Sequence, residues 1–274
     1  MFYTRKCGEI EESDFGSEQT LCGWLQDTRN LGGIAFLQLR DITGVIQLTL
    51  LKKKLGDENF KSWANINRES IILVRGIVKE NKEAPGGVEM LPDNIELMNE
   101  AETPLPLGVI DKIDSEIETR LNARYLDLRK TEIAANFQIR AAISGAVHKY
   151  LRRENFLEVQ TPKIIASATE GGTSLFEMKY FDKTAYLAQS PQLYKQMLMS
   201  GGLERVYEVG PAFRAEEHNT PRHLNEFISI DIEMSFADDD VVMGVMERLV
   251  ATAARTVSKE TKALKTLGIE PIEL

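Results

Sequence analysis

The sequence has little cysteine and no long apolar run, and each absence excludes a class of protein. Its 274 residues include only two cysteines, Cys7 and Cys22, which lack the spacing of metal ligands. This argues against a disulfide framework and is typical of a reducing cytoplasm. No stretch approaches about 18 consecutive apolar residues, and the first residues lack the apolar core of a signal peptide. We therefore expect a cytoplasmic protein without a membrane partner.

The balance of charge excludes a second class. The net charge is −9, which argues against a general nucleic-acid coat but leaves room for a local basic patch. Hydrophobic residues make up 43% and charged residues 27%, as in ordinary globular proteins. The length suits one large domain or two ordinary ones.

The region from 20 to 98 predicts a series of short strands. In one of them Ile46, Leu48 and Leu50 alternate with Gln47 and Thr49, the period of a half-buried strand. We expect strands at 21–26, 34–40, 44–50, 71–77 and 88–97, the last interrupted by Pro92, and a helix at 52–63. A helix between the third and fourth of five strands is the order of an OB-fold β-barrel. Another small barrel, or the edge of a sandwich, remains the alternative.

A connector separates this region from the rest. Pro104 and Pro106 favour extended backbone within an acidic stretch. We predict a barrel domain at 1–100, a hinge or linker at 101–130 and a second domain at 131–274.

The second domain mixes helices with strands. An apolar stripe at helical spacing predicts a helix over 131–153, with its members at Ile133, Phe137, Ile139, Ile143, Val147, Tyr150 and Leu151. We expect strands at 156–159, 185–188, 206–214 and 227–236, a helix at 192–200, and one last helix over 238–260 that starts with acidic residues. The fold class predicted for the chain is α+β.

Polar side chains alternate along the predicted strand 227–236. Ser229, Asp231 and Glu233 share one face, and acids facing inward are costly unless they are paired, so this face predicts a polar site. Arg214 and Glu216 share a face of the preceding strand, where an arginine could hold a phosphate chain. The alternative is a solvent-facing lattice of salt bridges.

Several short segments resemble class II aminoacyl-tRNA synthetases of the aspartyl type. Motif 2 is resembled by Phe213–Glu216, Arg222–His223 and Phe227, and motif 1, which forms much of the dimer interface in the family, by the segment that ends at 156–162. Arg124–Arg129 is similar to the subgroup of aspartate, asparagine and lysine enzymes, and Thr169–Gly172 followed by Gln189–Gln196 points to the archaeal and eukaryotic aspartyl-tRNA synthetases.

The resemblance implies an activity and its partners. An N-terminal OB-fold barrel would bind the anticodon, and an antiparallel class II catalytic sheet would follow. The enzyme would activate L-aspartate with ATP and Mg²⁺ and pass it to tRNA(Asp), as a homodimer; whether tRNA(Asn) is also charged is left open. Nothing after Phe236 resembles motif 3 or its neighbouring metal-binding carboxylates. We therefore expect a partial catalytic domain, no metal ligand within this chain, and no activity from these 274 residues alone.

The resemblance also assigns residue roles. For aspartate, Glu170 would bind the α-amino group, Gln192 would help to place the substrate, Lys195 would pair with its side-chain carboxylate, Asp231 would anchor Lys195, and Arg214 would bridge the α-carboxylate and the α-phosphate. The ATP-binding residues would be Arg214, Glu216, Arg222, His223, Leu224 and Phe227, of which Glu216 would recognise adenine, His223 the γ-phosphate, and Phe227 would stack under the base. Arg214 would be the catalytic residue. Plainer alternatives are a core position for Phe227 and a solvated Lys195.

In the barrel, Arg29, Phe36 and Gln47 would contact the anticodon, while Trp24 could equally be core. Gln26 and the loop containing Pro85 would discriminate the last anticodon base. Pro85 resembles the pattern of relatives that charge tRNA(Asp) alone, whereas Gln26 matches neither pattern, so the sequence favours discrimination.

Two other functions compete with this one. One is a truncated relative that keeps the tRNA-binding barrel without catalysis. The other is an amidotransferase-like paralogue that makes asparagine from aspartate without tRNA; such paralogues usually lack the barrel, which argues against it.

Overall fold

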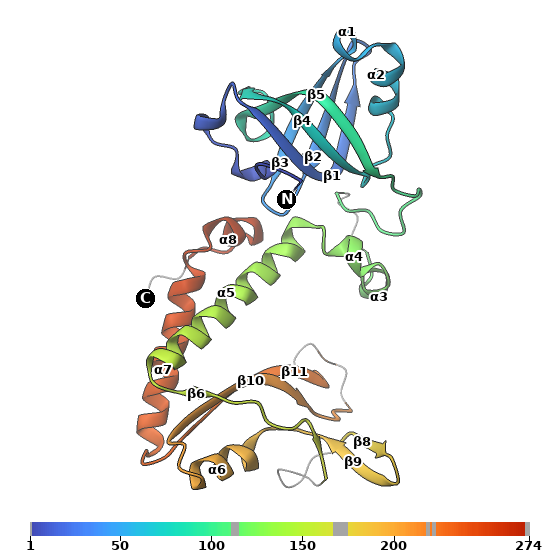
Figure 1. Cartoon of the computed structure of the whole chain (residues 1–274). Coiled ribbons are helices and arrows are strands. Elements are labelled where there is room, and N and C mark those ends of the chain that lie inside the picture. The colour runs from blue at the N-terminus through green and yellow to red at the C-terminus, as the bar shows by residue number, and fades with distance from the viewer. Residues whose placement is uncertain (1, 111–114, 167–174, 218–219, 221–222, 272–274) are drawn as a thin grey trace. The chain divides into compact units, whose positions relative to one another are not determined.

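The computed structural model describes residues 2–110, 115–166, 175–217, 220 and 223–271 (Figure 1). The chain divides into two compact units, Met1–Ala134 and Ala135–Leu274. Within the described ranges, no helix is long and apolar enough to cross a membrane.

The first unit is built on a closed five-stranded barrel with the order β1-β2-β3-β5-β4. Its strands are β1 (Glu18–Asn30), β2 (Ile34–Arg40), β3 (Val45–Leu51), β4 (Ile71–Glu80) and β5 (Val88–Asn99). Two helices, α1 (Lys52–Leu55) and α2 (Asp57–Ala64), connect β3 to β4, and short 3₁₀ turns lie at Cys7–Glu9, Glu12–Asp14 and Pro85–Gly87. This confirms the predicted OB-fold.

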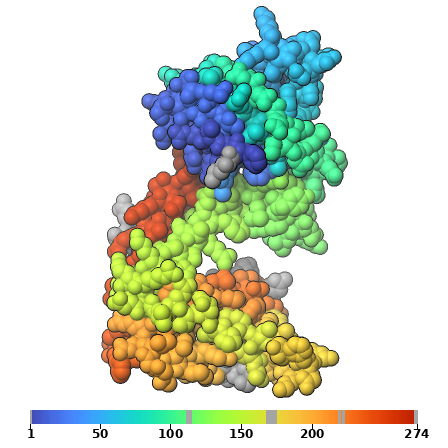
Figure 2. Space-filling model, in the orientation of Figure 1, coloured from blue at the N-terminus to red at the C-terminus, as the bar shows by residue number. Residues whose placement is uncertain are grey.

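The barrel interior is filled by the apolar half of each strand alternation. Leu21 and Leu25 of β1 are fully buried there, as are Leu37 and Leu39 of β2. Each such side chain contributes about 1.5–3 kcal/mol through burial. Phe60 of α2 joins the same core, so the α1–α2 segment covers one end of the barrel (Figures 1 and 2). The polar half of each alternation therefore faces outward.

Register shifts occur at three places in the barrel, and two of them affect predicted features. In β1, Leu25 pairs with Leu39 and Asp27 with Gln38, which leaves Gln26 unopposed. The interruption predicted at Pro92 is wrong, because β5 is continuous. Gly76 pairs with Pro92 and Arg75 with Asn94, so one residue of β5 is bulged between these two pairs. The bulge accommodates the proline, which has no backbone N–H to donate to the neighbouring strand. A Cβ on Gly76 would lie 2.3 Å from the Leu91 carbonyl oxygen, so the close approach requires glycine.

The segment predicted as a linker contains two short helices, α3 (Ile117–Asn122) and α4 (Arg124–Asp127), and belongs to the first compact unit. The carboxylate of Asp127 is fully buried and accepts hydrogen bonds from Arg120 and Arg124. Leu107 and Leu126 belong to a small apolar cluster in this segment.

The second unit contains a three-stranded sheet packed against helices. Its order is β11 (Glu226–Met234), β10 (Arg205–Phe213) and β6 (Leu157–Glu158). The helices α5 (Thr131–Arg153) and α7 (Asp239–Val257) cover one side of it (Figure 1). Their shared core is formed by Val147, Tyr150, Leu151, Phe156, Tyr207, Val245 and Leu249. Only the C-terminal half of the predicted α5 stripe is buried there, and Phe137 is 46% exposed.

The end of this unit differs from the prediction. Instead of one helix over 238–260, α7 ends at Val257 and α8 (Thr261–Leu267) follows. The chain leaves the helical region at Glu260, where ψ is 52°, so the helix cannot continue. The predicted acidic start is confirmed, since the Asp238 side chain accepts a hydrogen bond from the Val241 amide at 3.0 Å.

A second small sheet has the order β7 (Ile164–Ile165), β9 (Lys183–Leu187) and β8 (Glu177–Tyr180). The helix α6 (Gln192–Ser200) follows it and coincides with the predicted helix.

Candidate active site and anticodon-binding surface

The predicted polar face exists on the β10–β11 pair. Asp231 pairs with Glu208, Ser229 with Gly210 and Phe227 with Ala212. Because directly paired residues of antiparallel strands point to the same side, these side chains share one face. A Cβ on Gly210 would lie 3.2 Å from the Glu208 carboxylate, so glycine keeps this part of the face open.

At one end of this face, Lys195 of α6 reaches the strand. Its residue is only 4% exposed, and its Nζ lies 3.2 Å from Asp231 Oδ1 and 3.5 Å from Glu233 Oε2. Nζ also donates to the backbone oxygen of Ile232 at 3.2 Å. The ammonium is therefore held in place by carboxylates instead of solvated, which removes the plainer interpretation of Lys195.

The other polar groups on this face complete the arrangement. Gln192 Nε2 lies 3.5 Å from Glu233 Oε2, and Ser229 Oγ donates to Asp231 Oδ2 at 2.5 Å. The structure thus brings together Gln192, Lys195 and Asp231 as predicted, and adds Glu233 and Ser229. The strand alternation in the sequence already pointed to both of these additions.

Farther along the face, the Arg214 guanidinium carbon lies 5.4 Å from the centre of the Phe227 ring. Such stacking restrains a long cationic side chain without using its hydrogen-bond donors. Phe227 is half-buried. It lies four residues from Asp231, or about 13 Å along the strand. One face therefore carries a lysine held by carboxylates and, at a distance, an arginine on an aromatic ring.

Sequence reasoning missed a buried carboxylate beside the site. Glu208 accepts from the Thr161 amide at 3.0 Å and from the Thr161 hydroxyl at 2.7 Å, and pairs with Lys163 Nζ at 2.9 Å. These contacts tie the segment after β6 to the sheet next to Asp231. A single acid within the apolar run of β10 was the signal that could have identified it.

Of the other predicted residues, Glu216, His223 and Leu224 lie in the loop between β10 and β11. The Glu216 amide donates to the Arg214 carbonyl at 2.8 Å. His223 Nδ1 lies 2.6 Å from the Thr220 hydroxyl, and Leu224 is 59% exposed. Glu170 and Arg222 fall outside the described residues.

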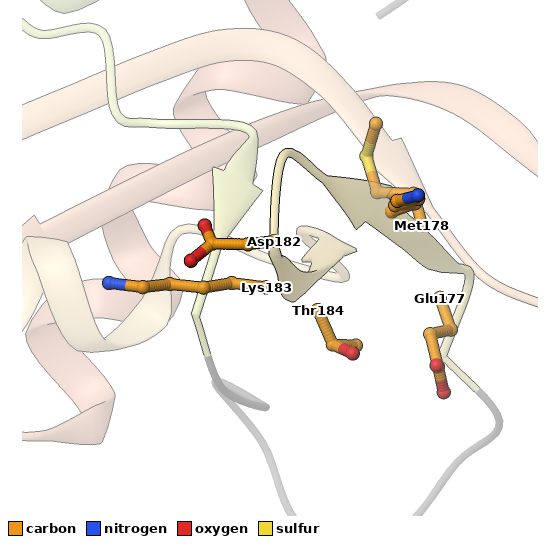
Figure 3. A pocket seen from close by; sticks show the side chains of 6 residues that line it. Glu177, Met178, Asp182, Lys183 and Thr184 are labelled. Atoms are coloured by element: carbon orange, nitrogen blue, oxygen red, sulfur yellow. The ribbon is translucent and has the colours of Figure 1, made fainter.

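The hollows in the second unit include the following two. A shallow one of about 360 Å³ lies on the β8–β9 hairpin, where Asp182 and Lys183 extend to the same side and Glu177 points away (Figure 3). None of its lining residues was predicted to bind substrate. The other, of about 310 Å³, lies between the end of β11 and the start of α7, and Glu233 contributes to its lining.

The outer face of the barrel carries the predicted anticodon residues. Phe36 of β2 pairs with Arg29 of β1 and with Thr49 of β3, and Gln38 pairs with Gln47. These side chains alternate with the buried ones, so they share the outer side of three adjacent strands. Arg29, Phe36 and Gln47 are therefore neighbours on one surface. Pro85 lies in the 3₁₀ turn between β4 and β5.

Glu89 joins this outer face from β5. Its carboxylate accepts from Thr49 Oγ1 at 2.5 Å and Gln47 Nε2 at 3.3 Å, and pairs with Lys79 Nζ at 2.9 Å. Burial by itself would raise the pKa of Glu89, but hydrogen bonds from Thr49, Asn81 and Lys79 outweigh it and lower that pKa. A fixed anion therefore lies beside Gln47.

Trp24 and Gln26 of β1 also lie on the outer face of the barrel. The Trp24 ring is half-buried beneath Arg129, whose guanidinium carbon lies 5.2 Å from the ring centre, so Trp24 is not part of the barrel interior. Its indole nitrogen is buried, with no hydrogen-bond partner among the described residues. Gln26 donates to Gln38 Oε1 at 3.1 Å and accepts from Arg40 at 3.4 Å.

An anticodon-type OB-fold joined to a synthetase-type antiparallel sheet defines a class of protein, and comparison with known families gives the same answer. Residues 116–272 match the family of tRNA synthetases class II (D, K and N), and residues 19–98 match the OB-fold nucleic acid binding domain. The chain belongs to the class II tRNA synthetases of the D, K and N group.

Within that family the chain is similar to proteins named for aspartate. It is 54% identical over 261 residues to the aspartate–tRNA(Asp/Asn) ligase of Methanopyrus kandleri, covering 94% of this chain and 61% of that protein. It is 48% identical over 272 residues to the aspartate–tRNA(Asp) ligase of Thermococcus kodakarensis, covering 98% of this chain and 62% of that protein. The chain thus spans about three-fifths of the length of these curated relatives.

Solved structures with the same fold include both aspartyl and asparaginyl enzymes. The asparaginyl-tRNA synthetase of Pyrococcus horikoshii, complexed with asparaginyl-adenylate, matches with a TM-score of 0.90 and 31% identity over 99% of this chain and 64% of that one. A protein described as a putative aspartyl-tRNA synthetase, from Leishmania major, matches with a TM-score of 0.87 and 30% identity over 96% of this chain and 54% of that one.

Proposed function

We propose that this chain carries the anticodon-binding and amino-acid-binding parts of an aspartate–tRNA ligase. The enzyme would activate L-aspartate with ATP to aspartyl-adenylate and transfer it to the 3′ end of tRNA(Asp). The names of the relatives at about 50% identity support aspartate as the amino acid. They support this reading over a binding module without catalysis.

The observation that carries the proposal is the position of Lys195. Aspartate and asparagine have nearly the same shape, so an enzyme must distinguish them by charge. The Lys195 ammonium is buried and held by Asp231 and Glu233, and a carboxylate of the substrate would be its third anionic partner. Asparagine offers no carboxylate to this cation, and a site built to pair with one substrate group can reject the analogue that lacks it by ~10⁴-fold or more.

The chemistry asks for positioning and charge stabilisation. The aspartate α-carboxylate attacks the α-phosphorus of ATP, a new O–P bond forms, and pyrophosphate leaves with the old one. No proton needs to move, because the nucleophile is already an anion. Arg214, restrained on Phe227, would stabilise the charge on the phosphoryl oxygens, and the adenine would stack on Phe227. The terminal ribose hydroxyl of tRNA then displaces AMP from the activated carbonyl.

The other ATP contacts follow the family pattern. Glu216 would accept from the adenine amino group, while Arg222, His223 and Leu224 would border the triphosphate and base, and Glu170 would bind the α-amino group of aspartate. Mg²⁺, when bound, would offset charge on the pyrophosphate. Among the described residues, no three His, Cys, Asp or Glu side chains are grouped so that they could hold a metal ion.

The outer barrel face would bind the anticodon loop. Phe36 offers a stacking surface, Arg29 a cation, and Gln47 with Glu89 a donor and acceptor pair for base edges. Gln26 and Pro85 would act on the last anticodon base. The relatives named for both tRNA(Asp) and tRNA(Asn) weigh against the discrimination favoured by the sequence. We further propose a cytoplasmic homodimer that forms through motif 1.

The test is aspartate-dependent exchange of pyrophosphate into ATP by the full-length protein, with asparagine as the competing substrate. We expect exchange with aspartate only, and loss of that preference in Lys195→Met. Lys179→Met, on the exposed β8–β9 hairpin, is the matched control and should leave both rates unchanged. Exchange with asparagine at a comparable rate, or an unchanged preference in Lys195→Met, would refute this assignment.

A further inference from the structure

A chain of hydrogen bonds with a fixed direction crosses the outer face of the barrel. It begins at Glu69, whose carboxylate accepts from Arg40 Nη2 at 2.9 and 2.8 Å and from Arg129 Nη1 at 2.9 Å. Arg40 Nη1 then donates to Gln26 Oε1 at 3.4 Å, and Gln26 Nε2 donates to Gln38 Oε1 at 3.1 Å.

The beginning of this chain is rigid. The side chains of Arg40 and Glu69 are 4% and 3% exposed, so neither can turn away without losing a buried partner. The Glu69 backbone has a left-handed φ of 68°, and its amide donates to the Leu25 carbonyl at 2.7 Å, next to the bulge at Gln26. The bulge at Gln26 and the Arg40–Glu69 ion pair therefore hold each other in position.

The chemistry of arginine sets the direction. A guanidinium can only donate, so the side chain of Gln26 must turn its carbonyl oxygen toward Arg40. Its amide nitrogen then faces Gln38, and Gln38 must present its own oxygen to receive that bond. Both side-chain N–H groups of Gln38 therefore point away from Gln26 and are not used in this series of hydrogen bonds. Among the described residues, nothing accepts a hydrogen bond from Gln38 Nε2.

Gln38 occupies the centre of the proposed anticodon surface. It pairs with Asp27 on β1 and with Gln47 on β3, and Phe36 lies two residues away on the same face. A half-buried amide with two oriented, unused donors beside a stacking ring is suited to the acceptor edge of an unstacked base.

We propose that Gln38 is a specificity-determining contact for an RNA base, and that Glu69, Arg40 and Gln26 act as positioning residues that hold it as a hydrogen-bond donor. This inference rests on the proposed function, because it assumes that the outer barrel face meets the anticodon loop. Gln38 is thus a further base contact beyond the residues predicted from the sequence. The hydrogen bonds from Glu69 through Arg40 and Gln26 to Gln38, called the relay below, give Gln26 an indirect role.

The first experiment measures affinity for a hairpin RNA that carries the tRNA(Asp) anticodon loop, using the 274-residue chain. Gln38→Met keeps the size of the side chain and removes its donors, so we expect about 5-fold weaker binding, the usual effect of one net hydrogen bond. Gln19→Met, the same change on β1 where the side chain bonds Thr4 and Ser17, should bind normally.

The second experiment tests the direction of the relay. In Gln26→Glu the new carboxylate still accepts from Arg40 but can no longer donate to Gln38. The Gln38 amide should then reverse, donate inward and display its oxygen. Across hairpins with each of the four bases at the sensitive loop position, Gln26→Glu should therefore change base preference in the same sense as Gln38→Glu. Far-ultraviolet circular dichroism and thermal unfolding check that each variant is folded.

The outcomes separate the two levels of the proposal. If Gln47→Met weakens binding while Gln38→Met does not, the role of Gln38 is refuted and the anticodon surface stands. If the wild-type chain does not bind the hairpin, both fail. If Gln38→Met weakens binding but Gln26→Glu keeps the wild-type base preference, the relay is refuted.

Discussion

Breaking the buried ion pair between Glu69 and Arg40 should strongly destabilise the barrel unit. Glu69 receives three charge-assisted hydrogen bonds, from Arg40 and Arg129, at 2.8 to 2.9 Å. Glu69→Gln removes the charge and one acceptor oxygen while it keeps the shape. Arg40 is then left buried with an incomplete partner, and breaking a buried pair typically costs about 3–5 kcal/mol.

The assay is equilibrium unfolding of the 274-residue chain in urea, followed by thermal unfolding. A loss of about 3 kcal/mol corresponds to a fall of roughly 10 °C in the melting temperature of a unit this size. The matched control is Asp27→Asn, which breaks the pair with Arg68 whose side chains are 39% and 51% exposed. Exposed pairs contribute at most about 1 kcal/mol. Equal effects of the two substitutions, or less than about 1 kcal/mol for Glu69→Gln, would refute this reasoning.

Three further predictions concern acid stability, catalysis and the isolated chain. Because the pKa of Glu89 is lowered in the folded state, the contribution of Glu89 to stability is complete above the ordinary glutamate value of 4.5 and is lost as pH falls through the lowered value. Glu89→Gln should therefore lack this pH-dependent part of the acid destabilisation, whereas Glu80→Gln should behave like the wild type. Arg214→Lys should lower pyrophosphate exchange by the full-length protein about 10²–10³-fold, since lysine cannot reproduce the stacked fork, and normal exchange would remove Arg214 from the chemistry. Residues 1–274 alone should show no aspartate-dependent exchange, because the sequence resembles motifs 1 and 2 but not motif 3; robust exchange would contradict this.

Local patterns in the sequence were sufficient for most of the fold. The alternation of Ile46, Leu48 and Leu50 with polar residues gave β3 its correct inner and outer faces, because period two depends only on neighbouring residues. The effect of Pro92 on β5 could not be predicted in this way, because it does not depend on neighbouring residues alone. Whether a proline interrupts a strand depends on the partner strand, and here a bulge opposite Gly76 accommodates it.

One candidate site could likewise be predicted from the sequence, whereas a cluster in the barrel could not. The family motifs were enough to bring Lys195 and Asp231 together, and the structure joins them at 3.2 Å. The Arg40–Glu69–Arg129 cluster could not be predicted, because it links residues separated by 29 and 60 positions. Its geometry depends on the barrel register, including a bulge that no local pattern announces. The direction of the hydrogen bonds at Gln38 follows only once that cluster is known.

The most direct test of the central claim is charging of tRNA transcripts by the full-length protein with labelled amino acids. Aspartate should be esterified to tRNA(Asp), and asparagine should not. A parallel tRNA(Asn) transcript distinguishes the discrimination favoured by Pro85 from the dual specificity in the names of several relatives. Charging of asparagine, or failure to charge tRNA(Asp) with aspartate, would contradict the proposed function.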